Sequence, residues 1–450
     1  MTFAEPKNKN YCSVVVALKN FVDLPNCNAV KAALIFGNSV IVGKDEQPGT
    51  LGLFFPVETA LSPEFLANNN LYRKVEWGNV NPDAKPGFFE EHGRVKAMKF
   101  RGHKSEGFWI PIAALSYLDI PIQEFSEGME FDVIDGFGFD KPQPICHKYI
   151  ARRNPGHMST NQPKQARAED RIVTGQFRFH IDTEQLRRNM HRIEPGTTIS
   201  ISDKWHGTSA IVSNVMVQRK LPWYERVLRK LGVAVQESEY GLVWASRRVV
   251  KSVGGEAKVN TAHYYDTDIW GVVAREIGDL VPKGYTVYGE IVGYTPEGSA
   301  IQKGYHYGCE AGSHKFIVYR VTLTNPDGQV VELSWHQMQE FCAKRGLEMV
   351  KEIYYGQAQF YGEYLNDSGD VELWREDFLN ALIRSVEDRL CPYNNSEVPA
   401  EGVVVRIERY DTCEVFKLKS FAFLKRESDA LDKGEEDIES AQDVPEPVAE

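Results

Sequence analysis

The sequence predicts an α+β fold in two main domains, and three observations lead to this prediction. Runs with alternating apolar and polar residues, typical of strands, recur along most of the chain. Patterns of helical period appear among them in the second half. A polar stretch with Pro and Gly but no periodicity, residues 151–172, separates the two parts, and we interpret it as a linker.

The first domain, residues 1–150, is predicted to be a small β-barrel. Alternating or apolar runs mark strands at 11–18, 51–57, 95–100 and 107–112, and 33–36 and 39–42 are typical of a hairpin around Gly37 and Asn38. A short helical insert follows at 62–66. Several short strands with one helical insert suit an oligonucleotide-binding (OB) fold, which is one kind of small barrel.

One loop of this domain mixes basic and aromatic residues. Arg101 and Lys104 lie near Trp109. Cations for phosphates and rings for bases are the chemistry of single-strand binding. The alternative interpretation is a solvated hairpin tip above an aromatic core.

The second domain, residues 173–426, is organised around Lys204. Alternating runs at 197–201 and 209–212 predict a strand on each side of a turn that contains Lys204 and Gly207. Apolar strands downstream carry Glu290, Glu401 and a lysine pair. A charge within an apolar strand is costly unless it is paired or faces a ligand. Lysines with carboxylates suit a triphosphate and a metal ion, so we expect these strands to meet at one site. We further expect a capped helix at 182–190 and helices at 334–345 and 376–390.

The order of these segments resembles the covalent nucleotidyltransferase superfamily of ATP-dependent ligases and capping enzymes. The segments in question are Lys204-Trp205-His206-Gly207, Ser246-Arg247, Gly289-Glu290, Lys315 to Val321, Glu401-Gly402 and Lys417-Leu418-Lys419. The Lys-x-His-Gly form is similar to the RNA ligase 2 branch. Residues 176–183 and a preceding domain are most similar to the Deinococcus-type RNA ligases, in which an OB domain precedes a nucleotidyltransferase domain of antiparallel sheets flanked by helices.

The resemblance implies a role for each motif residue. It makes Lys204 the nucleophile that forms lysyl-AMP, Glu401 the carboxylate for Mg²⁺ or Mn²⁺, and His206 a phosphate contact. Tyr319 or Phe316 would stack on adenine; strand alternation puts them on opposite faces, and Tyr319 is the preferred one. Arg248, next to Arg247, is expected on the opposite face and toward RNA. The nucleotide site as a whole comprises Asp203, Lys204, Arg247, Glu290, Phe316, Tyr319, Lys417 and Lys419, the last two also binding phosphate.

The implied activity is an ATP-dependent RNA ligase that seals 5′-phosphate and 3′-hydroxyl ends, with ATP and Mg²⁺ or Mn²⁺ as cofactors. RNA ends, in nicked duplex RNA or an RNA/DNA hybrid, are the expected partners of a monomeric enzyme. A DNA ligase or a GTP-using capping guanylyltransferase shares the motifs. An inactive RNA-binding protein is the alternative from another class.

The charge and cysteine content of the chain limit which of these functions are possible. The chain carries a net charge of −11, but residues 427–450 hold −9 of it, so the remainder can still contain a basic groove. That acidic tail is expected to be disordered. The seven cysteines lack metal-ligand spacing, which favours reduced thiols in the cytoplasm. The resemblance implies that the cell is bacterial or phage-infected. Neither a signal peptide nor a membrane span is expected.

Overall fold

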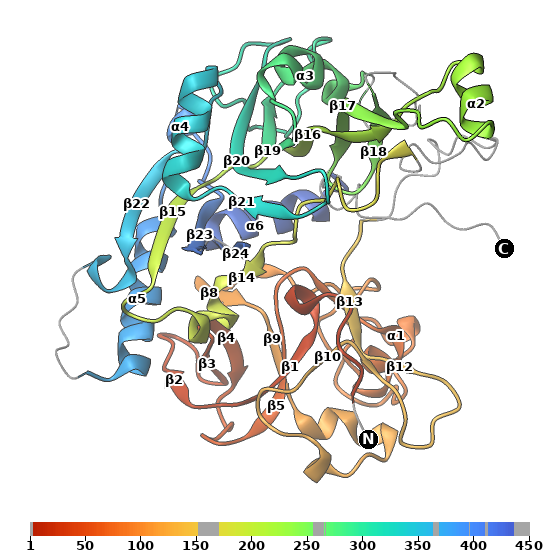
Figure 1. Cartoon of the computed structure of the whole chain (residues 1–450). Coiled ribbons are helices and arrows are strands. Elements are labelled where there is room, and N and C mark those ends of the chain that lie inside the picture. The colour runs from red at the N-terminus through yellow and green to blue at the C-terminus, as the bar shows by residue number, and fades with distance from the viewer. Residues whose placement is uncertain are drawn as a thin grey trace.

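The computed structural model describes residues 3–151, 171–254, 265, 267–362, 369–395, 397–409 and 413–435. Two masses lie one above the other in Figure 1, the N-terminal domain below and the larger domain above. Most of the predicted linker, 152–170, and the end of the predicted tail, 436–450, lie outside the described residues.

The N-terminal domain is built from short antiparallel strands. Its main sheet has the order β10-β1-β5-β9, and β2, β3 and β4 form a second sheet. Two-stranded pairs are formed by β6 with β13, β7 with β8, and β11 with β12. The bounds are β1 Ser13–Ala17, β2 Asn20–Val22, β3 Val30–Ile35, β4 Asn38–Gly43, β5 Leu51–Phe55, β6 Thr59–Leu61, α1 Pro63–Asn68, β7 Ala97–Phe100, β8 His103–Glu106, β9 Phe108–Pro111, β10 Glu130–Phe131, β11 Val133–Ile134, β12 Gln143–Pro144 and β13 Cys146–Lys148.

The predicted strands and the helical insert of this domain are present, but the strands belong to several separate sheets. Among the described strands the ladders do not join into one closed barrel, so an OB fold stays a prediction. The predicted hairpin is β3–β4, with its turn one residue earlier than expected. Ile35 pairs with Asn38, and both Phe36 (φ 51°) and Gly37 (φ 72°) have positive φ, as a two-residue hairpin turn of type I′ requires.

The larger domain consists of two sheets whose pairings are antiparallel except for β14 with β24. A five-stranded sheet has the order β14-β24-β23-β15-β22, and a six-stranded sheet has the order β18-β17-β16-β19-β20-β21. The bounds are β14 Glu184–Gln185, β15 Thr198–Lys204, β16 Thr208–Gln218, β17 Ser238–Ser246, β18 Val250–Val253, β19 Tyr285–Gly293, β20 His314–Thr324, β21 Val330–Glu332, β22 Glu352–Gln357, β23 Gly402–Glu408 and β24 Cys413–Lys419.

Helices cover the outer faces of these sheets. Trp270 and Met338, from α3 and α4, pack in one core with Val287 and Ile317 of the six-stranded sheet. Phe378 of α5 belongs to a separate core with the five-stranded sheet. The bounds are α2 Trp223–Lys230, α3 Ile269–Ile277, α4 Trp335–Arg345, α5 Val371–Val386 and α6 Phe421–Asp432. Among the described helices, none is both long and apolar enough to cross a membrane.

The structure corrects two predicted segments. The expected helix at 182–190 is instead strand β14 followed by 3-10 turns, because Glu184 and Gln185 pair in parallel with Phe416 and Lys417 of β24. The acidic tail starts later than predicted, since 427–432 continue helix α6. Arg94 and Lys96 of the N-terminal domain pair with Asp432 and so offset its negative charge.

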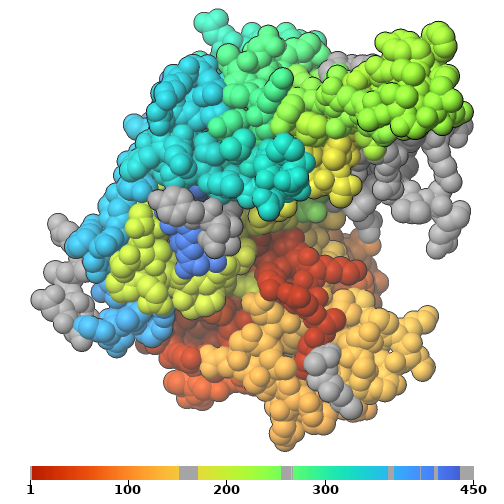
Figure 2. Space-filling model, viewed as in Figure 1, coloured from red at the N-terminus to blue at the C-terminus, as the bar shows by residue number. Residues whose placement is uncertain are grey.

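The two domains are joined by buried polar contacts. The side chain of Asn10 donates to the carbonyl oxygen of Thr183 (3.0 Å) and accepts from the backbone N–H of Gln185 (2.9 Å). Arg187 pairs with Glu106 at 3.4 Å, and both side chains are more than nine-tenths buried. In the space-filling view of Figure 2 the red-to-orange N-terminal domain lies directly against the yellow-green and blue parts of the larger domain.

Candidate active site

Lys204 lies where the chain passes from one sheet to the other. It ends β15 of the five-stranded sheet, and Thr208 begins β16 of the six-stranded sheet. Trp205 packs against the rings of Tyr307 and Tyr393, with centroids 4.6 and 4.5 Å away, which fixes the turn. The glycine of the motif is required by space, because a Cβ on Gly207 would lie 2.2 Å from the carbonyl oxygen of Ile291 in β19.

The Lys204 amine faces a buried carboxylate. Its Nζ lies 2.7 Å from Oε1 of Glu401, whose side chain is 1% exposed. Strand register explains the meeting: Lys204 lies beside Gly402, and Gly402 lies beside Lys419 on the next strand. Within the described part of the chain neither Glu401 oxygen receives a hydrogen bond. A buried carboxylate with spare acceptor capacity fits a hydrated divalent cation.

Lys417 and Lys419 point from β24 into the same region and have opposite electrostatic surroundings. Burial and the charges of Lys419 and Lys204 lower the pKa of Lys417 to about 8. Burial also lowers the pKa of Lys419, but the carboxylates of Glu427, Glu58 and Glu401 outweigh it, so this pKa is raised well above its usual value. Lys419 is therefore a permanent cation.

Three of the predicted nucleotide-binding residues, on β19 and β20, differ in where they lie. Glu290 is buried and accepts a hydrogen bond from the backbone N–H of Gly207 (3.2 Å). Tyr319 lines the same pocket as Lys204, and its hydroxyl is 2.9 Å from Ser209 Oγ. Phe316 instead fills core space against Gly289, where a Cβ would lie 2.5 Å from its ring. The geometry thus favours Tyr319 as the pocket aromatic.

Arg247 and Arg248 do not point to opposite faces, as strand alternation had suggested. Both bind Asp182, Arg247 to Oδ1 at 2.8 Å and Arg248 to Oδ2 at 2.7 Å. The reason is that β17 ends at Ser246, so the two arginines lie in a bend where alternation no longer applies. Only Arg247 lines the Lys204 pocket.

Asp203 directly precedes Lys204 and His206 follows it by two residues, and their side chains make different contacts. The Asp203 carboxylate is engaged by Arg389 and by the Tyr393 hydroxyl (3.2 Å), which ties the end of β15 to the segment after α5. The His206 ring contacts the rings of Tyr305 (5.1 Å) and Phe423 (5.0 Å) and lines a second cavity, not the Lys204 pocket.

The three N-terminal residues predicted to bind RNA are placed differently from one another. Trp109 is buried in the domain core beside Phe54, which is the alternative interpretation of this ring. Arg101 is exposed and donates to the carbonyl oxygen of Asn26 (3.3 Å). Lys104 pairs with Glu387 across the domain boundary and lines the same cavity as His206.

The N-terminal domain also supplies walls of the Lys204 pocket, which sequence reasoning missed. Tyr11, Glu58 and Lys148 line it together with His180 and Asp182. Glu58 lies 3.3 Å from Lys419 Nζ and accepts a hydrogen bond from the Tyr11 hydroxyl (2.9 Å). The one signal in the sequence was Glu58, a lone carboxylate between the apolar runs that form β5 and β6.

The pocket is narrow in this structure. It holds about 130 Å³, below the roughly 300 Å³ at which small-molecule sites usually begin. The pKa of His180 is lowered to about 3, by burial first and then by the charges of Arg320 and Arg247, so this ring is neutral. A nucleotide requires the side chains that cross the pocket to move aside.

One protein-family model matches the part of the chain that carries this site. The family model described as RNA ligase matches residues 197–420, which include Lys204, Glu290, Glu401, Lys417 and Lys419. No curated protein matches the chain.

Solved structures share the fold over both domains. Naegleria gruberi RNA ligase with ATP and Mn has a TM-score of 0.55 at 14% identity, covering 94% of this chain and 100% of that one. The same ligase with AMP and Mn scores 0.54 at 14% identity, covering 92% and 98%. Its form with PPi scores 0.54 at 14% identity, covering 94% and 99%. Residues 197–420 are therefore similar to the RNA ligase family, and both domains share the fold of Naegleria gruberi RNA ligase.

Proposed function

We propose that this protein is an ATP-dependent RNA ligase that joins a 5′-phosphate to a 3′-hydroxyl through lysyl-AMP. The observation that carries the proposal is the Lys204 amine at 2.7 Å from a buried Glu401, with Lys417 and Lys419 on the adjacent strand. This is the arrangement of a nucleophile, a carboxylate for a cation and two cations for phosphate.

In the first step the neutral Lys204 amine attacks the α-phosphorus of ATP. An N–P bond forms, the bond to the β-phosphate oxygen breaks, and pyrophosphate leaves. The ion pair with Glu401 holds the amine in place as an ammonium group, so it must lose one proton to water before attack and a second one as the N–P bond forms. Lys417 and Lys419 repel the first proton and then neutralise charge on the α-phosphate.

A divalent cation at Glu401 supplies Lewis-acid stabilisation of the α-phosphate when bound. Naegleria gruberi RNA ligase has been solved with ATP and Mn, which supports the same pair of cofactors for this chain. We propose that Tyr319 stacks on the base and Glu290 binds the ribose, since both line the same pocket as Lys204.

Two further steps complete the joining. A 5′-phosphate oxygen of RNA attacks the phosphorus of lysyl-AMP, the N–P bond breaks, and the lysine recovers its amine. The 3′-hydroxyl oxygen then attacks the RNA phosphorus, its proton is lost, and AMP leaves as the phosphodiester forms.

The finer proposals concern relatives and substrate. Placement of a β-rich domain before the catalytic one supports the Deinococcus-type architecture with an OB-like first domain. We propose nicked duplex RNA or an RNA/DNA hybrid as substrate, a monomeric enzyme, and a role in RNA repair in the cytoplasm of a bacterial or phage-infected cell.

The test is transfer of label from α-labelled ATP or GTP to the denatured protein in the presence of Mg²⁺ or Mn²⁺. We expect label from ATP only, lost in Lys204→Ala and kept in Lys344→Ala, an exposed lysine on α4. Label from GTP only would indicate a capping guanylyltransferase. Absence of label from folded wild-type protein would favour the inactive RNA-binding protein.

A further inference from the structure

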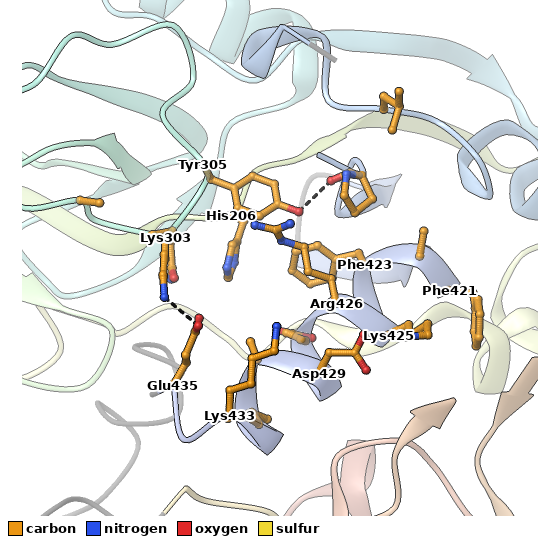
Figure 3. A pocket seen from close by; sticks show the side chains of 18 of the residues that line it. His206, Lys303, Tyr305, Phe421, Phe423, Lys425, Arg426, Asp429, Lys433 and Glu435 are labelled. Carbon is orange, nitrogen blue, oxygen red and sulfur yellow. Dashed lines mark hydrogen bonds and ion pairs between the residues drawn. The ribbon is translucent and has the colours of Figure 1, made fainter. Parts of the chain in front are cut away.

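The largest cavity described here is a groove beside the active site. It holds about 910 Å³ and lies between α6, the β7–β8 hairpin, the 299–305 loop and the segment after α5. We call it the α6 groove; Figure 3 shows its labelled residues His206, Lys303, Tyr305, Phe421, Phe423, Lys425, Arg426, Asp429, Lys433 and Glu435.

The groove lies next to the nucleotide pocket. His206 lines the groove, while Lys204, two residues earlier, lines the nucleotide pocket. Glu427 also lines the groove, and its carboxylate lies 3.1 Å from Lys419 Nζ, which lines the nucleotide pocket. The two cavities have no lining residue in common, but they are neighbours, joined through the Lys204–His206 turn and the Glu427–Lys419 ion pair.

The groove carries charges of both signs, with the carboxylates of Glu387, Asp388, Glu427, Asp429 and Glu435 among its cations. Lys104, Lys303 and Lys425 already pair with Glu387, Glu435 and Asp429, respectively. Three further cations line the groove without a carboxylate within 4 Å among the described residues: Lys99, Arg426 and Lys433. Cations without carboxylate partners can exchange water for backbone phosphates at little cost.

Arg426 is the cation best placed near the reaction. In Figure 3 it lies beside His206, Tyr305 and Phe423 at one end of the groove. Its guanidinium carbon is 5.5 Å from the centroid of the buried Tyr305 ring, which orients the planar fork without using its hydrogen-bond donors. A bidentate contact to a phosphate remains open to it.

We propose that the α6 groove binds the 5′-phosphorylated RNA strand that receives AMP, with Arg426 and Lys433 contacting its backbone phosphates. This inference rests on the proposed ligase function and adds the substrate site to it. The strand that receives AMP is a polyanion whose end must come to Lys204, and the groove offers cations beside the turn that carries this lysine. Tyr11 and Glu58 of the N-terminal domain line the nucleotide pocket, not the groove.

The experiment separates the reaction steps in the full-length enzyme. Arg426→Glu and Lys433→Glu are compared with Lys85→Glu, an exposed loop lysine outside the groove, and Arg426→Gln serves as a milder variant. We measure lysyl-AMP formation, AMP transfer to a 5′-phosphorylated nick in duplex RNA, and sealing of a nick adenylylated beforehand. Equilibrium binding of the nicked RNA is measured separately, by fluorescence anisotropy.

We expect lysyl-AMP formation within about twofold of wild type in all variants, because no variant lies in the nucleotide pocket. AMP transfer and sealing at limiting RNA should each fall at least about tenfold in Arg426→Glu, and the salt dependence of RNA binding should weaken by about one phosphate contact. Lys85→Glu should match wild type.

Two results would overturn the groove assignment while leaving the ligase function intact: unchanged transfer, or a defect in sealing alone, which would assign the groove to the 3′-hydroxyl strand. If wild type forms no lysyl-AMP, the proposed function fails. In that case the RNA-binding measurement alone tests the groove assignment. Equal RNA affinity of Arg426→Glu and wild type would overturn the assignment.

Discussion

Lys417 shows how single residues in this site are tuned by their neighbours. Its side chain is buried beside two other lysines, and its pKa falls to about 8 from an ordinary 10.5. The folded chain therefore releases this proton near pH 8, while the unfolded chain keeps it to about 10.5. Between those values the unfolded state binds more protons, so stability rises with pH.

We predict that Lys417→Met removes this rise. The free energy of unfolding of wild type should gain up to about 3 kcal/mol, relative to the variant, between pH 8 and 10.5. Urea denaturation of both proteins across this range is the measurement. The comparison cancels other groups that titrate there, and parallel profiles would contradict the lowered pKa.

The sequence predicted the residues around Lys204 well because each carries a charge inside an apolar strand. Glu290, Glu401, Lys417 and Lys419 were recognisable in this way, and the structure brings them together. Glu58 and Asp182 were not assigned, because their partners are distant in sequence and their own surroundings lack a motif. Arg248 does not lie on the face opposite Arg247, because β17 ends at Ser246. The alternation of residues along a strand does not predict where the strand ends.

At the scale of elements, the turn from β15 to β16 is tightly constrained. Gly207 lies so close to β19 that a Cβ would overlap the carbonyl oxygen of Ile291. The neighbour is backbone and cannot move aside alone. Any larger residue must therefore shift the turn that carries Lys204.

Gly207→Ala is therefore predicted to lower the free energy of unfolding by about 1–3 kcal/mol and to slow lysyl-AMP formation. Gly196→Ala, in an exposed turn with nothing within 4 Å, is the matched control and should change stability by less than about 0.5 kcal/mol. Thermal denaturation and the labelling assay test both. Equal behaviour of the two variants would mean that the close approach has no consequence.

Elements were predicted where local patterns dominate and missed where tertiary contacts decide. The helix expected at 334–345 is α4, and Ser334 forms a capping box at its start. The capping pattern at Asp182 led to a wrong helix, because Asn10 and β24 take up the backbone groups that a helix would use. Helix α6 extends into acidic sequence because cations of the other domain balance it.

For the whole molecule, the contact of Glu58 with Lys419 is the charge pair that links domain docking to the active site. Burial raises the pKa of Glu58, but Lys419, a hydrogen bond with Glu427 and the charge of Lys417 outweigh it and lower the pKa to about 2. The group's ordinary value is 4.5, so the unfolded chain takes up this proton first on acidification. The stability that Glu58 contributes is present above pH 4.5 and is lost as pH falls toward 2.

We predict that Glu58→Gln lowers the free energy of unfolding at neutral pH by about 2 kcal/mol, the typical value of a charged hydrogen bond. The variant should also lose less stability than wild type on acidification. Denaturation at neutral pH and near pH 4 measures both effects, and small-angle scattering reports whether the domains separate. If Glu58→Gln and wild type lose the same stability between neutral pH and pH 4, the role of the Glu58 carboxylate is contradicted.

In the proposed reaction two anions, the Glu58 carboxylate and the α-phosphate, compete for the Lys419 ammonium group. Glu58 now holds this ammonium group, and in the proposed reaction the α-phosphate needs the same one. Nucleotide binding and domain docking are then antagonistic, and thermodynamic reciprocity requires each to weaken the other by the same factor. In the proposed reaction ATP therefore weakens one of the contacts between the two domains, while Glu427 of the larger domain still holds the Lys419 ammonium group.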